Sequence, residues 1–146
     1  MGQHQLPQAS VAAVSDLLAR GETAPRVLTP SEADHGYHQL RRLLGGALSR
    51  EQVLAELKAS QLRGLGGAGF PAWRKWETVR AQPGRKAMVV NIDEGEVGTF
   101  KDWLVLSMGA PQVLEGVLVA AEVVGLDHVW LYLRDEYHDL RPMLLR

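Results

Sequence analysis

The stretch QLRGLGGAGFPAWRKW, residues 61–76, decides how the rest of the chain is interpreted. Four of these residues are glycine, which reaches positive φ without steric cost and lets the backbone approach a ligand closely. Successive N–H groups in such a run form a concave anion site. Pro71 has the fixed φ that suits the first position of a helix, and Lys75 adds a cation one turn later. The stretch therefore predicts a glycine-rich loop leading into a helix N-terminus, which suits a phosphate.

The spacing G-x-G-x-x-G at residues 64–69 also fits the dinucleotide fingerprint, which requires a strand before it and a helix after it. We expect the helix, over about residues 71–81. Residues 51–60, EQVLAELKAS, instead carry apolar side chains at helical spacing, so an ordinary Rossmann loop is not predicted. A glycine-rich turn without a ligand is the alternative. Lys75 and the neighbouring aromatic residues favour a ligand.

Composition sets the broad class of the protein. The chain has 146 residues, 46% of them apolar and 23% charged, which is enough for one domain with a core. The net charge of −1 implies no general attraction to nucleic acid or to an anionic membrane. There is no cysteine, which excludes disulfides and any thiolate-held iron–sulfur cluster within the chain. The absence of cysteine fits a cytoplasmic protein.

No apolar run approaches the length of a membrane span, so we expect no direct membrane span. The N-terminus lacks the basic and apolar regions of a signal peptide. His35 and His38 are three residues apart, but no further ligand follows at a suitable spacing. We therefore interpret them as surface residues and predict no metal site.

The N-terminal third is predicted to be helical. We expect an amphipathic helix at residues 7–20 and a linker at 21–30, which together form the first segment, 1–30. The second segment, 31–146, begins with a helix capped by Ser31 and ended by Gly45-Gly46. A third helix, opened by a capping box at Ser49 and Gln52, runs to about Ser60.

The remainder predicts an α/β fold in which these helices precede a Rossmann-like βαβ unit with a parallel sheet. The strands are expected at KAMVVNI, residues 86–92, and HVWLYLR, residues 128–134. A short helix at 101–108 and a long apolar helix from Pro111 to Gly125 separate them. A further helix is expected from Glu136, with Pro142 disturbing it.

An acidic stretch follows the first predicted strand: Asp93, Glu94, Glu96 and Asp102 lie within ten residues. A solvated turn is the ordinary interpretation, and the ligand spacing of a calcium loop is missing. The position favours ligand recognition, because polar residues that follow a buried strand hold ligands in open α/β sheets. A carboxylate at this position is suited to accept hydrogen bonds from ribose hydroxyls or to orient the polar edge of a flavin or nicotinamide ring. Asn91 supplies both a hydrogen-bond donor and an acceptor for such an edge.

Together, two motifs carry a family resemblance. The glycine stretch resembles L-R-G-R-G-G-A-G-F-P-T-G-x-K-W, and NIDEGEVGTFKD, residues 91–102, resembles N-A-D-E-x-E-P-G-T-F-K-D. LYLRDEY, residues 131–137, resembles a segment ending L-R-G-E-Y. Residues 37–137 thus resemble the N-terminal part of the flavoprotein NADH-binding subunit of respiratory complex I. They also resemble the related subunits of NAD-linked hydrogenases and NAD-dependent formate dehydrogenases.

The resemblance implies an FMN- and NADH-binding part of an NADH dehydrogenase-type oxidoreductase, in which hydride passes from NADH to FMN. No side chain need act as nucleophile or general base, although Glu94 is a candidate orienting carboxylate. Iron–sulfur clusters would be held by other subunits, with the assembly cytoplasmic or peripheral on the inner face of a membrane. The implied cofactor-binding residues are Arg63, Gly64, Gly66, Gly67, Ala68, Gly69, Phe70, Lys75, Asn91, Asp93, Glu94 and Glu96.

The chain also departs from the family pattern. The substituted positions are Leu65, Ala72-Trp73, Ile92, Val97, Trp103 and Asp135. The family's later flavin-contacting motif and its four cluster cysteines are not in this sequence, so the fold is incomplete relative to the family. A truncated or degenerate member, acting as a nucleotide-binding or subunit-interaction module without turnover, is therefore the alternative.

Overall fold

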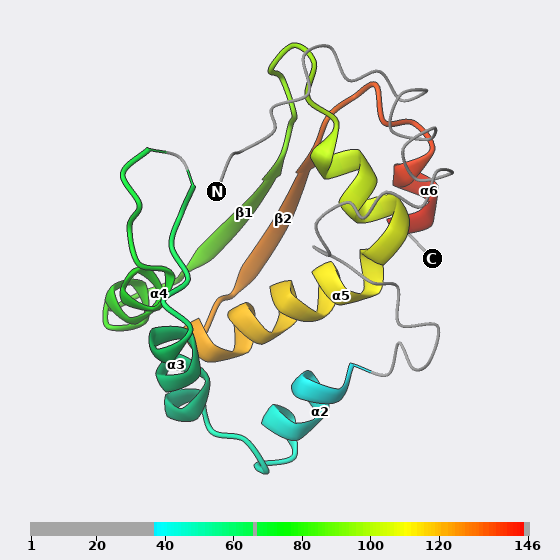
Figure 1. Cartoon of the computed structure of the whole chain (residues 1–146). Helices are drawn as coiled ribbons and strands as arrows, with labels where there is room; N and C mark the ends of the chain where they lie inside the picture. Colours follow the sequence, from blue (N-terminus) through cyan, green and yellow to red (C-terminus); the bar gives the residue numbers. More distant parts are fainter. Residues whose placement is uncertain (1–36, 66, 145–146) are drawn as a thin grey trace, which may run out of the picture. The chain divides into compact units, whose positions relative to one another are not determined.

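The computed structural model describes residues 37–65 and 67–144 (Figure 1). In chain order its elements are α2 (His38–Leu44), α3 (Arg50–Ala59), α4 (Ala72–Arg80), β1 (Ala87–Ile92), α5 (Lys101–Val124), β2 (His128–Leu133) and α6 (Leu140–Leu144). This order confirms the predicted α/β class. The helix predicted at 7–20, the linker at 21–30 and the cap at Ser31 lie outside the described residues.

The described chain divides into two compact units. The glycine-loop unit comprises residues 37–65, 67–91 and 111–132. The acidic-loop unit comprises residues 92–110 and 133–144. Each unit holds one of the two motifs, and each is described by itself.

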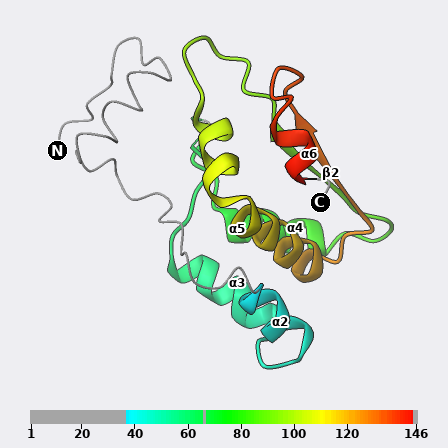
Figure 2. The same cartoon turned by 90° about the vertical axis from the view of Figure 1, so that its right-hand side faces the viewer.

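The core of the glycine-loop unit lies between α2, α3 and the C-terminal half of α5 (Figure 2). Leu43, Val53 and Val123 are buried there, one from each helix, and Trp76 of α4 packs against them. Because α4 directly follows the glycine loop, this packing anchors the loop to the body of the unit.

The ends of α3 form as the sequence predicts. Ser49 accepts a hydrogen bond from the Gln52 N–H, and the Gln52 side chain accepts one from the Ser49 N–H. This reciprocal capping box satisfies two donors at the start of the helix. The stretch before the glycine loop is thus a helix and not a strand, which confirms that this is no ordinary Rossmann loop.

The start of α2 is capped by a residue of another helix. The helix begins at His38, with Tyr37 as the N-cap in the left-handed region and without a side-chain cap of its own. Glu115 of α5 supplies the acceptor instead, because its Oε1 takes hydrogen bonds from the N–H groups of Gln39 at 2.6 Å and Leu40 at 3.1 Å. A cap supplied by a residue 75 positions away in the chain cannot be predicted from short sequence motifs.

The two strands form a parallel pair. The N–H of Asp127 donates to the carbonyl of Lys86, and the N–H of Arg134 donates to that of Ile92, so both strands advance in the same direction. Burial alternates along each strand, as the pleat requires. With α5 between the strands, this confirms the predicted βαβ unit.

One face of the sheet is apolar and exposed. Val89 of β1 and Trp130 and Tyr132 of β2 are each more than half exposed. These three residues are the exposed sheet face discussed below.

Helix α5 contains a break where the sequence predicts one. Gly109 has non-helical dihedral angles, φ −150° and ψ 34°, which separates the segment before it from the one that starts near Pro111. Gly125, at φ +76°, ends the second segment. A proline near a helix start keeps the helix intact, because the missing N–H would have no partner there.

Among the described helices, α5 alone is long and apolar enough to cross a membrane by length and composition. The expectation that no segment approached that length was wrong, because it counted only uninterrupted apolar residues. Gly109 interrupts α5, and Ala120, Val123 and Val124 in its C-terminal half are buried in the glycine-loop unit.

The last helix begins later than predicted. α6 starts at Leu140, and residues 135–139 form turns, because the N–H of Tyr137 donates to Arg134 O and that of Leu140 to Tyr137 O. Each hydrogen bond closes a four-residue turn, and α6 begins only at Leu140, where the second turn ends. Pro142 lies in the first turn of α6, where it removes no helical hydrogen bond. The expectation that Pro142 would disturb this helix was therefore wrong.

Candidate functional site

The base of the glycine loop is closed by backbone pairing. Arg63 and Pro71 form an antiparallel bridge, flanked by hydrogen bonds from Gly64 N–H to Phe70 O at 3.0 Å and from Ala72 N–H to Leu62 O at 2.9 Å. The residues between them form a loop whose two ends are fixed at the start of α4. Pro71, with φ −63° and ψ 126°, is the N-cap of α4 and not its first helical residue, one position from the expectation.

The tip of the loop needs glycine for its backbone. Gly67 and Gly69 have φ of +83° and +57°, which side-chain-bearing residues rarely adopt. A Cβ built on either residue would meet no atom within 4 Å. The loop is therefore open on these sides, so that a planar or phosphate-bearing group can lie against its backbone.

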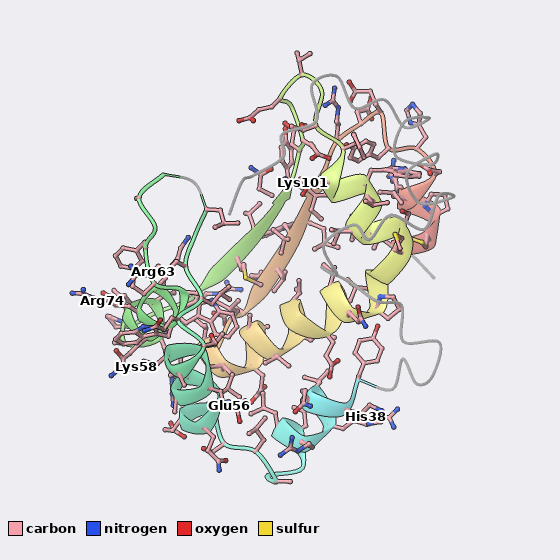
Figure 3. All side chains as sticks on the ribbon, viewed as in Figure 1. His38, Glu56, Lys58, Arg63, Arg74 and Lys101 are labelled. Atoms are coloured by element: carbon pink, nitrogen blue, oxygen red, sulfur yellow. The ribbon has the colours of Figure 1, made fainter. Side chains whose placement is uncertain are left out.

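Cationic side chains surround the base of the loop. Arg63 Nη1 donates to Gly69 O at 3.1 Å, which places the guanidinium across the loop. Lys58 lies over the Trp73 ring, with Nζ 4.8 Å from the ring centroid. Figure 3 shows Lys58, Arg63 and Arg74 where α3, the loop and α4 meet. This positive charge favours an anionic ligand.

Lys75 lies in the first turn of α4, where its N–H donates to Pro71 O. It lines a cavity of about 320 Å³ together with apolar residues of α4, β1 and the C-terminal half of α5. The predicted cation is thus next to the loop in sequence and borders a largely apolar cavity of the same unit.

In the acidic-loop unit, Glu94 holds together the loop that follows β1. Its Oε1 accepts from the N–H of Lys101 at 2.7 Å, and its Oε2 accepts from the N–H of Asp102 at 2.9 Å. Both donors belong to the first turn of α5, so the carboxylate caps that helix. Its side chain is only 1% exposed.

Two residues after β2 fasten the same loop. The Tyr137 hydroxyl donates to Glu94 Oε2 at 2.8 Å, and Arg134 Nη1 donates to the Glu94 carbonyl oxygen. The Arg134 guanidinium is itself oriented by two hydrogen bonds to the Glu136 carboxylate, each 3.0 Å. Sequence analysis missed both residues: they belong to the LYLRDEY segment of the resemblance, but nothing in their spacing indicates the contact with Glu94.

The electrostatics of this cluster follow from its contacts. Burial alone would raise the pKa of Glu94, but the hydrogen bonds from Tyr137 and from the first turn of α5 lower the pKa overall. Burial and the bond to Glu94 raise the pKa of Tyr137 to about 12. Glu94 is therefore ionised and Tyr137 protonated at neutral pH.

A cavity of about 440 Å³ adjoins this loop. Residues 95–100 form one wall, and Arg134, Glu136 and Tyr137 form the other. Glu96, predicted to contact the dinucleotide, lines it. The acidic loop thus borders an open space of a size that suits part of a ligand.

The predicted site residues fall into two groups. Arg63, Gly64, Gly67, Ala68, Gly69 and Phe70 lie in the glycine loop, whereas Asp93, Glu94 and Glu96 lie in the acidic loop. Asn91 lies in β1. Gly66 lies outside the described residues. Within the described part of the chain, no group of three or more His, Asp or Glu side chains is placed to hold a metal ion.

The chain resembles known proteins both in sequence and in structure. Residues 57–144 match the model of the Nuo51 FMN-binding domain family, and the match includes most of the glycine-loop unit and the whole described acidic-loop unit. A solved NAD+-reducing nickel–iron hydrogenase in the H2-reduced state resembles the chain with a TM-score of 0.68 and 28% identity. The alignment covers 95% of this chain and 27% of that one.

Relatives by sequence give the same result. The chain is 40% identical over 112 residues to an NADH-quinone oxidoreductase subunit of Rhizobium meliloti (strain 1021), covering 76% of this chain and 26% of that protein. It is 41% identical over 114 residues to the alpha subunit of the NAD-reducing hydrogenase HoxS of Cupriavidus necator, covering 76% and 19%. The chain thus spans about a quarter or less of these relatives. Because the family model covers more than half of the chain and both motifs lie within it, the chain belongs to the Nuo51 FMN-binding domain family.

Proposed function

We propose that this chain is the FMN- and NADH-binding part of an oxidoreductase that passes hydride from NADH to FMN. The observation that carries the proposal is the glycine loop, which combines positive-φ glycines, open space beside them and the Arg63 guanidinium. These features fit a flat, anionic group such as FMN, because backbone N–H groups and a fixed cation serve as donors to it.

Each loop has its own part in the proposal. In the glycine loop, Arg63, Gly64, Gly66, Gly67, Ala68 and Gly69 approach FMN, Phe70 stacks on the dinucleotide, and Lys75 contributes a phosphate contact. Asn91 at the end of β1 and Asp93 of the acidic loop contribute to the flavin side, and Glu96 binds NADH. Glu94 is the orienting carboxylate of the acidic loop. Bound FMN supplies the hydride-accepting chemistry, and the residues of the chain bind and orient.

The names of the relatives support a proposal for the partners of the chain. Those named above are subunits of an NADH-quinone oxidoreductase and of an NAD-reducing hydrogenase. The chain has no cysteine, so it ligates no thiolate-held iron–sulfur cluster itself. We therefore propose other subunits carrying such clusters as its partners, in an assembly that is cytoplasmic or peripheral on a membrane. A formate dehydrogenase assembly remains a further prediction of the resemblance.

A module that binds nucleotide or another subunit without turnover is the second candidate. The exposed sheet face favours it. Such a module predicts binding of FMN or a partner without reduction by NADH.

The test is an FMN titration of the 146-residue chain, followed by quenching of flavin fluorescence and then by NADH addition without oxygen. Gly67→Ala is compared with Gly84→Ala, because both glycines have positive φ and open space beside them, but only Gly67 lies in the glycine loop. We expect Gly67→Ala to weaken FMN binding at least about tenfold and Gly84→Ala to leave it unchanged. No FMN binding by the unaltered chain, or equal effects of the two variants, would refute the proposal.

A further inference from the structure

The hydrogen bonds around Glu94 indicate a role for this carboxylate that the family resemblance does not imply. Glu94 is the only buried charged residue in the described part of the chain, and each of its carboxylate oxygens is engaged by the protein itself. A carboxylate in this position is not presented to a ligand. It is instead placed to control the backbone around it.

The contacts define what is controlled. Glu94 precedes residues 95–100 and Lys101 follows them, and the bond from Lys101 N–H to Glu94 Oε1 joins the two ends of this segment. The N–H of Thr99 donates to Glu96 O, which folds the tip. Glu96 therefore sits on a short closed loop whose geometry depends on the orientation of one carboxylate.

That orientation is fixed from outside the loop. Tyr137 holds Oε2 and Arg134 holds the backbone carbonyl of Glu94, so the side chain and the main chain are each anchored by a residue that follows β2. Both anchoring residues also line the 440 Å³ cavity that Glu96 borders. The anchors and the proposed ligand contact thus line the same cavity of one unit.

We infer that Tyr137 and Arg134 are positioning residues that act through Glu94 to set the acidic loop, and with it Glu96, for the nicotinamide dinucleotide. Glu94 is then a structural carboxylate and not a direct flavin contact. The ligand in this inference rests on the proposed function, whereas the control of the loop does not.

The experiment compares Tyr137→Phe with Trp103→Phe in the 146-residue chain. The Trp103 Nε1–H donates to Asp139 Oδ2 at 3.1 Å, so the control also deletes one hydrogen bond between the start of α5 and the segment after β2. It retains an aromatic ring and leaves every contact of Glu94 intact. Tyr137→Phe therefore removes a hydrogen bond to Glu94 of the acidic loop, whereas Trp103→Phe removes one that does not involve Glu94.

The first readout needs no cofactor. Amide hydrogen exchange reports on the N–H groups of Lys101 and Asp102, whose acceptor Tyr137 orients. We expect Tyr137→Phe to accelerate their exchange about tenfold, the loss expected for one hydrogen bond to a charged group, and Trp103→Phe to leave it unchanged. Equal exchange in Tyr137→Phe and the unaltered chain would overturn the inference.

The second readout separates positioning from general stability. In the FMN-supplemented chain, Tyr137→Phe is expected to weaken NADH binding about tenfold while FMN affinity stays within about twofold, because the glycine loop is unaltered. Parallel losses of both affinities, or of neither, would contradict positioning. If the unaltered chain binds neither ligand, the proposed function fails, and amide exchange alone decides this inference.

Arg134→Lys is the second variant, because lysine keeps the charge and cannot bond Glu94 O and the Glu136 carboxylate in the same fork. It is expected to reproduce both effects of Tyr137→Phe. If Tyr137→Phe does not fold, Arg134→Lys decides by the same two readouts, and unchanged exchange would count against the inference.

Discussion

Two opposing effects act on the pKa of Glu94. Burial raises the pKa, whereas hydrogen bonds and the charge of Lys101 lower it, and the net result is a lowered pKa. A carboxyl whose pKa is lower in the folded state than in the unfolded one stabilises the fold above its unfolded pKa. The ordinary value is 4.5. The contribution of Glu94 is therefore complete at neutral pH and is lost as the pH falls below 4.5 through the folded pKa.

We predict that Glu94→Gln lowers the free energy of unfolding at neutral pH by about 1–3 kcal/mol, because an amide leaves one N–H of the first turn of α5 without an acceptor. The variant should also lose less stability than the unaltered chain on acidification below pH 4.5. Urea unfolding between neutral and acidic pH measures both effects. Glu122→Gln, at a carboxylate that pairs with Arg50 on the surface, is the control and should change little. A parallel pH dependence in Glu94→Gln and the unaltered chain would exclude this account.

Part of the candidate site could be predicted from the amino-acid sequence. The glycines at positive φ and the cluster of acids after β1 were predicted from the sequence, because both follow from backbone freedom and from position after a strand. The burial of Glu94 was not, since its partner Tyr137 is 43 residues away and no local spacing encodes that contact.

At the scale of elements, the cap of α2 shows how one helix depends on another. Glu115 of α5 accepts from two N–H groups at the start of α2, the role that a Ser or Asp N-cap usually performs. We predict that Glu115→Ala lowers the free energy of unfolding by about 1–2 kcal/mol, measured by urea denaturation.

The matched control is Glu122→Ala, which removes a carboxylate of the same helix that pairs with Arg50 on the surface. An exposed pair contributes at most about 1 kcal/mol, so its loss should be smaller than that of Glu115. Equal losses in the two variants would show that α2 does not rely on the Glu115 cap.

Elements were predicted better than their ends. β1, β2, α3 and the break in α5 follow from patterning, capping boxes and Gly–Pro signals, which act within a few residues. The start of α6 was misplaced because successive turns override local propensity there. The cap that Glu115 provides for α2 was not predicted, because it is a long-range contact.

At the scale of the whole molecule, the exposed sheet face is the feature most open to association. Val89, Trp130 and Tyr132 are large and exposed on adjacent strands, and contiguous apolar patches mark interaction surfaces. We predict that the purified chain self-associates with increasing concentration and that Trp130→Ser weakens this association roughly tenfold.

Sedimentation velocity over a concentration series measures that association. Leu65→Ser is the control, because Leu65 is fully exposed but lies in the glycine loop, outside the exposed sheet face. Association that is unaffected by Trp130→Ser, or equally reduced by Leu65→Ser, would argue against the sheet face as the surface involved.

The family was also predicted at this scale, because two motifs in the right order identify it without any contact information. The described chain divides into two compact units, and of the boundaries between them only the one at residues 110–111 coincides with a sequence signal, the Gly109–Pro111 break in α5. The other boundaries in the described part of the chain fall inside β1 and β2, where the sequence pattern of each strand is continuous.

Two hydrogen bonds to the Glu94 carboxylate each close a loop of the chain, and the lengths of these loops have a consequence for the order of folding. Lys101 bonds to Glu94 across 7 residues, and Tyr137 bonds to it across 43. The entropy of closing a loop grows with the logarithm of its length, so the longer closure costs about 1.6 kcal/mol more. The short closure is therefore expected to form early on the folding pathway and the Tyr137 bond late. During synthesis the acidic loop can take its turn as soon as α5 begins, but it acquires its final geometry only after the second strand has emerged.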